Sequence, residues 1–134
     1  MEPLDCPAVE VSAVECVAGR GIRGDRFFLE KRDQKRQITF FSMEVYELMC
    51  LELGVSDRHP SVLRRNVFVR GADLGALIGS AFQLQDVVFE GVEECRPCFW
   101  MDQAFGPGAE NFLKDRGGLR ARVMGDGMLR ASGA

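Results

Sequence analysis

Fifteen glycines are spread along the 134 residues and divide the chain into short apolar segments. Glycine adopts backbone conformations that other residues avoid, so it commonly ends helices and strands and forms turns. Several of the segments between the glycines are rich in valine, isoleucine and phenylalanine, which favour strands. The spacing therefore favours a mainly β fold with many short strands over a helical bundle.

The apolar pattern predicts strands over residues 9–17, 36–41, 66–70, 81–90, 92–95, 119–123 and 128–130. Within residues 81–90 the apolar side chains change from even to odd positions, which predicts a β-bulge near Gln85 and Asp86. Gly91 is expected to turn the chain into a hairpin, and Asp126-Gly127 is a second hairpin signal. The glycine-rich stretch 19–28 is predicted to be a loop.

One long helix is expected to begin after Ser42, whose hydroxyl can cap it, and to end at Gly54. A short helix is predicted over residues 109–116, whereas residues 99–108 contain Gly106, Pro107 and Gly108 and are expected to form a loop. Together these elements predict a mainly β (α+β) barrel in a single domain, with one long and one short helix.

Charge and hydropathy exclude several classes of protein. The net charge is -3, which does not favour nucleic acid as a partner. No apolar run approaches the roughly 18 residues of a membrane span, and no signal sequence opens the chain. We therefore expect a cytoplasmic protein with no membrane contact.

The sequence ECRPC places Cys95 and Cys98 three positions apart, with Arg96 and Pro97 between them. Proline restricts its own backbone and that of the residue before it, so the segment is expected to form a stiff elbow. A neighbouring arginine lowers the pKa of a thiol, and the thiolate is both a nucleophile and a ligand for soft metals. The alternative is a buried structural cysteine, and the spacing alone leaves both interpretations open.

Other cysteine and glycine motifs are incomplete. Five cysteines do not suit a secreted disulfide framework, and one CxxC pair with the single histidine, His59, is too few ligands for a zinc site. A thioredoxin-like motif would need a helix at the cysteine pair, and none is expected there. The GxGxxG spacing of Gly19, Gly21 and Gly24 has no helix after it, so a dinucleotide site is rejected.

Arginine outnumbers lysine fourteen to three, and its planar fork suits phosphate and carboxylate groups. Arg64 and Arg65 lead directly into the predicted strand that begins at Asn66, where a loop meets a sheet. Their alternative role is that of a solvated strand end. Arg26 lies in the glycine-rich loop, whose backbone N–H groups can approach an anion.

Five stretches, GIRGDRFF, RQITFF, LRRNVFVRG, ECRPC and GGLRARVMGDG, occur in the order and spacing of the MOSC domain. The chain thus resembles the C-terminal domain of molybdenum cofactor sulfurases, in its stand-alone bacterial form, from about Gly19 to Met128. The resemblance implies a β-barrel like that of pyruvate kinase, with residues 1–134 as one domain. The strand that usually opens the domain has no counterpart, so either the chain lacks it or a partner closes the sheet.

The resemblance also implies the site. Cys98 corresponds to the family's cysteine, which carries sulfur or ligates molybdenum, so it is the expected catalytic residue and metal ligand. Arg64, Arg65 and Asn66 correspond to residues that hold the phosphate end of the molybdenum cofactor (molybdopterin), and Arg26 is a further cofactor-binding residue. The resemblance assigns no role to Cys95.

Two functions follow from the resemblance. The first is a terminal oxidoreductase that reduces N-hydroxylated compounds at a cysteine-ligated molybdenum and receives electrons from a partner protein. The alternative is a sulfur carrier or cofactor-delivery module that holds a persulfide on Cys98 and is supplied by a cysteine desulfurase. No pyridoxal phosphate is expected in this chain. An unpaired sheet edge would favour homo-oligomers.

Overall fold

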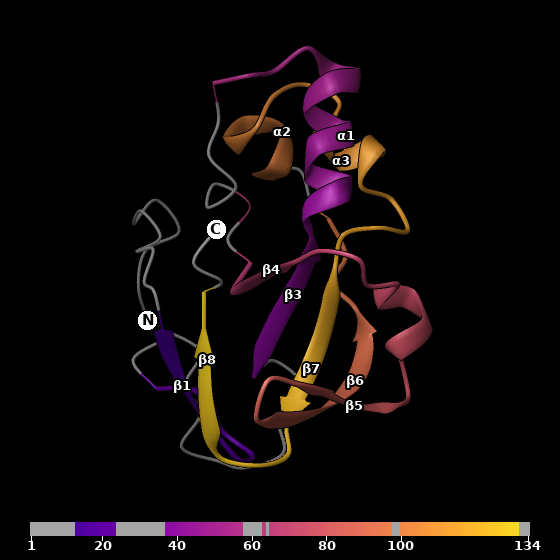
Figure 1. The fold of residues 1–134 in the computed structure, drawn as a ribbon. Coiled ribbons are helices and arrows are strands. Elements are labelled where there is room, and N and C mark those ends of the chain that lie inside the picture. Colours follow the sequence, from indigo (N-terminus) through magenta and orange to yellow (C-terminus); the bar gives the residue numbers. More distant parts are fainter. Residues whose placement is uncertain (1–12, 24–36, 58–62, 64, 98–99, 132–134) are drawn as a thin grey trace.

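The computed structural model describes residues 13–23, 37–57, 63, 65–97 and 100–131 (Figure 1). In chain order its elements are β1 (Ala13–Val17), β2 (Gly21–Ile22), β3 (Ile38–Ser42), α1 (Met43–Leu53), β4 (Val67–Val69), the 3-10 helix η2 (Leu74–Leu77), β5 (Ala81–Leu84), β6 (Val87–Glu94), α2 (Trp100–Ala104), α3 (Ala109–Phe112), β7 (Leu119–Val123) and β8 (Gly127–Arg130). The mainly β fold that the sequence predicts is confirmed. None of the helices in the described ranges is long and apolar enough to span a membrane.

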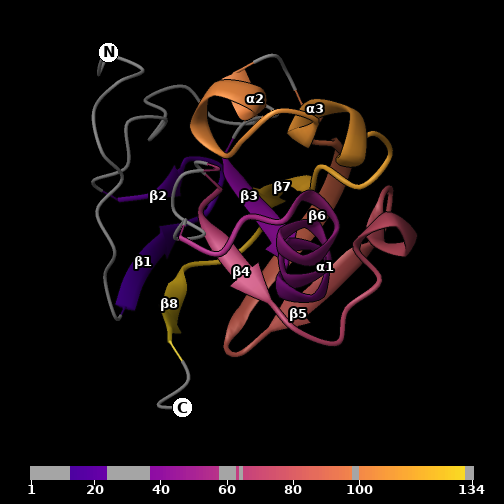
Figure 2. The same ribbon diagram turned by 90° about the horizontal axis from the view of Figure 1, so that it is seen from above.

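Five strands form a curled sheet in the order β4-β3-β7-β6-β5. β3 and β4 run parallel, and the other neighbours are antiparallel. Because side chains alternate along a strand, each strand sends every second residue to one face of the sheet. A smaller sheet, β2-β1-β8, lies beside the first (Figures 1 and 2). The core that the two sheets share consists of Cys16, Ile22, Ile38, Phe40, Val87, Phe89, Leu119, Ala121, Val123 and Leu129.

Polar contacts join the two sheets. The Gly19 N–H donates to the Val123 carbonyl at 2.8 Å, and the Ala18 N–H donates to Asp126 Oδ1 at 2.7 Å. The Gln85 side chain bonds both main-chain groups of Arg130, as a neighbouring strand would. These contacts satisfy main-chain groups where the ladders end.

The helices gather at the upper end of the five-stranded sheet in Figure 1. The α1 helix begins where Ser42 Oγ accepts the Val45 N–H and ends at Gly54, which has left-handed backbone angles, so this prediction is confirmed. Tyr46 and Met49 of α1 are buried. The second core cluster consists of Phe41, Tyr46, Met49, Leu63, Met101, Phe105, Ala109 and Leu113.

The region 81–95 differs from the prediction. The change of parity near Gln85 and Asp86 is a hairpin turn between β5 and β6, not a bulge, and Gln85 has a positive φ of 54°. Conversely, Gly91 lies within β6, where the register shifts between Gly91 and Glu93. The alternation of apolar side chains cannot by itself distinguish a bulge from a tight turn. Both change which residues, the even-numbered or the odd-numbered, point to the buried face of the sheet.

Three further expectations, one about a hairpin and two about loops, were wrong. β8 does not form a hairpin with β7; it pairs with β1 in the smaller sheet. The predicted loop 99–108 contains α2, and within the predicted loop 19–28 Gly21 and Ile22 form the short strand β2. The short helix predicted over residues 109–116 is confirmed as α3, although it is shorter and spans Ala109–Phe112. The partners of β2 and β8 depend on contacts between distant segments, which local composition does not report.

Candidate functional site

The cysteine elbow, residues 94–98, begins where β6 ends. Glu94 is paired with Leu119 of β7, and the Cys95 N–H donates to the Gly118 carbonyl at 2.8 Å. Cys95 is buried, with 5% of its surface exposed, whereas Arg96 is exposed. The ladder stops there because Pro97 has no N–H to donate. Cys98 lies outside the described residues, so its predicted role stays a prediction.

Arg65 lies beside this elbow and donates to main-chain carbonyls of three separate segments. Its Nε donates to Gly117 O at 3.0 Å, its Nη1 to Leu63 O at 3.1 Å, and its Nη2 reaches Cys95 O at 3.5 Å. Arginine can do this because its donors spread in a rigid plane. The stretch before β4 and the cysteine elbow are therefore neighbours, although about thirty residues separate them.

Two consecutive glycines before β7 lie closely against other segments, Gly117 against the elbow and Gly118 against β3. A methyl group at Gly117 would lie 2.2 Å from Cys95 O and 3.0 Å from Pro97 Cδ. At Gly118, where φ is +111°, it would lie 2.4 Å from Phe40 O. Neither position has room for a side chain. The doubled glycine after residue 116 was the sequence signal for this approach, although it predicted only the end of a helix.

Asn66 joins the same region to β3. Its Oδ1 accepts the Thr39 N–H at 2.8 Å and the Thr39 hydroxyl at 3.0 Å, and its own N–H donates to Thr39 Oγ1 at 3.0 Å. These bonds extend the contact between the parallel strands β3 and β4 by one residue. Asn66 thus has a defined part in the fold, and its predicted contact with a cofactor stays a prediction.

The remaining predicted site residues, Arg64 and Arg26, lie outside the described residues, as Cys98 does. Among the predicted residues that are described, Arg65 and Asn66 are adjacent in sequence, and Arg65 contacts the elbow that leads to Cys98. Within the part of the chain that the structure covers, no three His, Cys, Asp or Glu side chains gather as a metal site of protein ligands would require.

Cys16 is not an activated thiol. Burial raises the pKa of Cys16 to about 11, with a smaller contribution from the negative charge of Glu15. Cys50 is half-buried on α1. Burial, followed by a hydrogen bond with Cys50, raises the pKa of Tyr46 above its usual range. A thiol that stays protonated at neutral pH is a poor nucleophile and a poor metal ligand.

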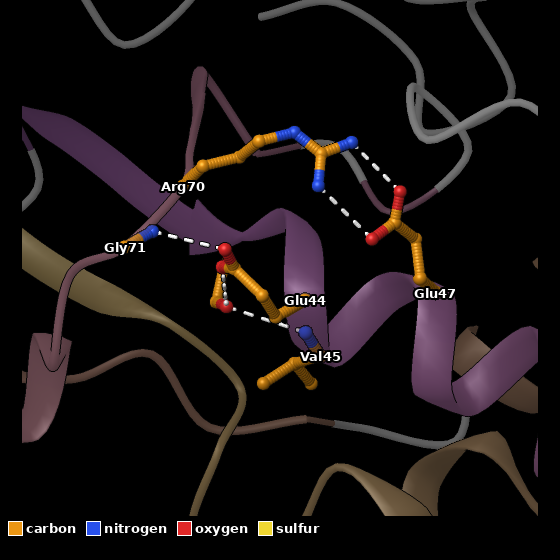
Figure 3. A network of polar contacts seen from close by, with 6 residues as sticks. Glu44, Val45, Glu47, Arg70 and Gly71 are labelled. Atoms are coloured by element: carbon orange, nitrogen blue, oxygen red, sulfur yellow. Dashed lines mark hydrogen bonds and ion pairs between the residues drawn. The ribbon is translucent and has the colours of Figure 1, made fainter.

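A network of exposed charges fixes the start of α1 against the end of β4 (Figure 3). Arg70 donates through both terminal nitrogens to Glu47, at 3.0 and 2.7 Å, and the Gly71 N–H donates to Glu44 at 3.0 Å. The bond from Arg70 lowers the pKa of Glu47, and main-chain N–H groups lower the pKa of Glu44. These exposed bonds connect α1 to the residues that follow β4.

An apolar cavity of about 230 Å³ lies between β3, β5 and η2. Its lining comprises Phe40, Val69, Arg70, Ala72, Leu74, Leu77, Phe82, Gln83 and Leu84. The polar side chains in that lining bond elsewhere, since Arg70 donates to Glu47 and Gln83 donates to Gln85 O. The cavity could therefore enclose an apolar group, but its polar side chains are engaged elsewhere and do not orient a reacting ligand.

Comparison with known proteins identifies both the family and the fold. The MOSC domain family matches residues 24–132. The YuaD protein of Bacillus subtilis has a similar structure, with a TM-score of 0.74 and 19% identity over 90% of this chain and 81% of that one. A crystal structure of a hypothetical protein has a TM-score of 0.72 and 16% identity over 91% of this chain. The match spans 59% of that second protein's length. No curated protein matches the chain.

Proposed function

The chain belongs to the MOSC domain family, and we propose that it binds the molybdenum cofactor, with the Cys98 thiolate as the protein ligand of the metal. We further propose that it acts as a terminal oxidoreductase for N-hydroxylated compounds, with electrons supplied by a separate protein. Arg64, Arg65, Asn66 and Arg26 are the proposed contacts of the cofactor's phosphate end.

The observation that supports this proposal is the contact between the arginine stretch and the cysteine elbow. Arg65 reaches the Cys95 carbonyl at 3.5 Å, so one of the proposed phosphate-binding side chains lies beside the end of β6, three residues before the proposed ligand Cys98. A cofactor with a metal at one end and a phosphate at the other requires both kinds of group in one region.

The residues fit the group chemically. The cofactor brings a dithiolene and oxo groups to molybdenum, so one soft thiolate from the protein is a suitable further ligand. When bound, it supplies the two-electron chemistry that converts an N–OH group and two protons into N–H and water. The chain contributes the thiolate, the cationic grip on the phosphate and the rigid elbow between them. Arg96, between the two cysteines, places a cation two positions before the proposed ligand.

Metal analysis tests the proposal directly. Protein purified from a molybdenum-replete host should carry molybdenum and pterin, and Cys98→Ser should lose both. Cys95→Ser is the matched control, because Cys95 is buried and three residues away; it should retain the metal. If Cys98→Ser keeps as much molybdenum as the parent, the assignment of the ligand is wrong.

The alternative function, a sulfur carrier, gives a different result in the same preparations. A carrier would hold one extra sulfur atom on Cys98, visible by mass spectrometry and removed by a thiol reductant. It would show no reduction of an N-hydroxylated amidine with an artificial electron donor. A persulfide without molybdenum would therefore replace the oxidoreductase proposal with the carrier.

A further inference from the structure

We propose that the apolar cavity between β3, β4, β5 and η2 is a binding site for a small neutral aromatic molecule. The proposal does not depend on the proposed function, since none of the residues assigned to the cofactor lines this cavity. Of the nine described residues that line it, seven are apolar, and the volume is about 230 Å³. An apolar cavity of about 150 Å³ is enough to hold benzene, so one aromatic ring with a substituent fits here.

The cavity lies where the five-stranded sheet does not close into a barrel. β4 and β5 are the outermost strands of this sheet, and both contribute to the lining, with Val69 from β4 and Phe82 and Leu84 from β5. In the described part of the chain no strand joins β4 to β5. A closed barrel would pair these two edges and fill its interior with side chains. The open sheet leaves a hollow between them instead.

The 3-10 helix η2 forms a fixed wall of this hollow. Leu74 and Leu77 of η2 line the cavity. Beyond η2 the Gly79 N–H donates to the Gly91 carbonyl at 2.8 Å, and the Gly91 N–H donates to the Ser80 carbonyl at 3.0 Å. The approach is so close that a methyl group at Gly91 would lie 2.1 Å from Leu77 O. Because η2 is held on β6 in this way, it does not collapse into the cavity.

Two phenylalanine rings in the lining favour an aromatic guest. Phe40 and Phe82 meet edge to face with their centroids 5.6 Å apart, and Phe89 packs against both, at 5.1 and 5.5 Å. Phe40 is buried among its neighbours, whereas Phe82 is only half-buried. A bound ring would cover more of Phe82 and add an aromatic contact, which contributes more than the buried area alone.

The polar residues of the lining favour a neutral guest. Arg70 donates through both terminal nitrogens to Glu47, and the side-chain amide of Gln83 donates to Gln85 O. A charge on the guest would therefore lose water without gaining an ion pair, and that loss is costly. A neutral ring has no such cost. The ligand class is thus a neutral single-ring aromatic molecule, with any polar substituent on the side that faces water.

Methyl NMR of the whole chain tests this site, with benzyl alcohol as the probe. Its addition should give saturable shift changes with a Kd of about 1 mM or lower. The changes should be confined to the methyl groups of Val69, Leu74, Leu77 and Leu84, which line the cavity. Benzoate is the matched charged probe, and it should bind at least about tenfold more weakly because its carboxylate lies one bond from the ring.

A substitution that fills the cavity gives the second test. Ala72 has the smallest side chain in the lining, and Ala72→Phe should lower the affinity for benzyl alcohol at least about tenfold. Ala76→Phe is the matched control, because Ala76 is exposed on the same 3-10 helix and does not belong to the described lining. Its affinity should equal that of the parent.

Each outcome decides the question. The absence of saturable shift changes in the parent overturns the proposal, as does an unchanged affinity in Ala72→Phe. Benzoate bound as tightly as benzyl alcohol refutes the neutral class. If Ala72→Phe does not fold, the parent still decides: NOEs from the ring protons of benzyl alcohol to the methyl groups of Leu74, Leu77 and Leu84 support the site, and NOEs to other methyl groups alone overturn it. The molybdenum content of the purified protein tests the proposed function separately.

Discussion

Replacing Gly117 with alanine should displace the cysteine elbow, and the structure indicates how far. The new methyl carbon would lie 2.2 Å from Cys95 O, whereas a carbon and an oxygen in contact stay about 3.3 Å apart. The elbow or the strand must therefore move by about 1 Å. Backbone strain does not contribute, because Gly117 is not among the residues with positive φ.

The cost has two sources. Forcing an extra methyl group into a packed site costs about 1–3 kcal/mol. The shift also stretches the bonds from Cys95 N–H to Gly118 O and from Arg65 Nε to Gly117 O, each of which contributes about 0.5–1.5 kcal/mol. We therefore expect Gly117→Ala to lower the free energy of unfolding by about 2–6 kcal/mol.

Urea unfolding, followed by the fluorescence of the single tryptophan, measures this loss. The midpoint should fall by about 1 M or more, with an unchanged slope. Gly125→Ala is the control, because a methyl group there would meet nothing within 4 Å, and it should stay within about 0.5 kcal/mol of the parent. If Gly117→Ala is as stable as Gly125→Ala, the elbow does not pack on Gly117.

The remaining predictions concern stability and its dependence on pH. Asn66→Ala leaves two groups of Thr39 without their acceptor and should lower the free energy of unfolding by about 1–3 kcal/mol, whereas Asn66→Asp keeps the acceptor and should cost less; chemical denaturation compares them. Because the pKa of Glu47 is lowered, its bond with Arg70 stabilises the fold above the ordinary carboxyl pKa of about 4.3, and this stabilisation is lost as the pH falls. The melting temperature of Glu47→Gln should therefore fall less on acidification than that of the parent. The raised pKa of Cys16 acts in the opposite range: stability should decline between pH 9 and about 11 as the unfolded thiol ionises, and Cys16→Val should remove that part of the decline. A parental decline in Cys16→Val would refute that explanation.

The sequence determined the features that depend on neighbouring residues. Ser42 and Gly54 set the ends of α1, because a cap and a left-handed residue act within a few positions of themselves. Alternation in β7 placed Leu119, Ala121 and Val123 on the buried face. The order of the motifs led to the family, and the family's match over residues 24–132 confirmed it.

Only the tertiary structure decided which distant segments meet. The apolar side chains change from even to odd positions near Gln85, which is expected for either a bulge or a turn. The pairing of β5 with β6 shows that it is a turn. The turn signal before β8 suggested a hairpin, but β1 is its partner. Likewise, the residue type of Arg65 suggested a grip on an anion, and only the fold shows that its guanidinium donates to the carbonyls of residues 63, 95 and 117. Side-chain chemistry is local and can be read from sequence, whereas the partner of a long side chain depends on how strands far apart in the chain are brought together.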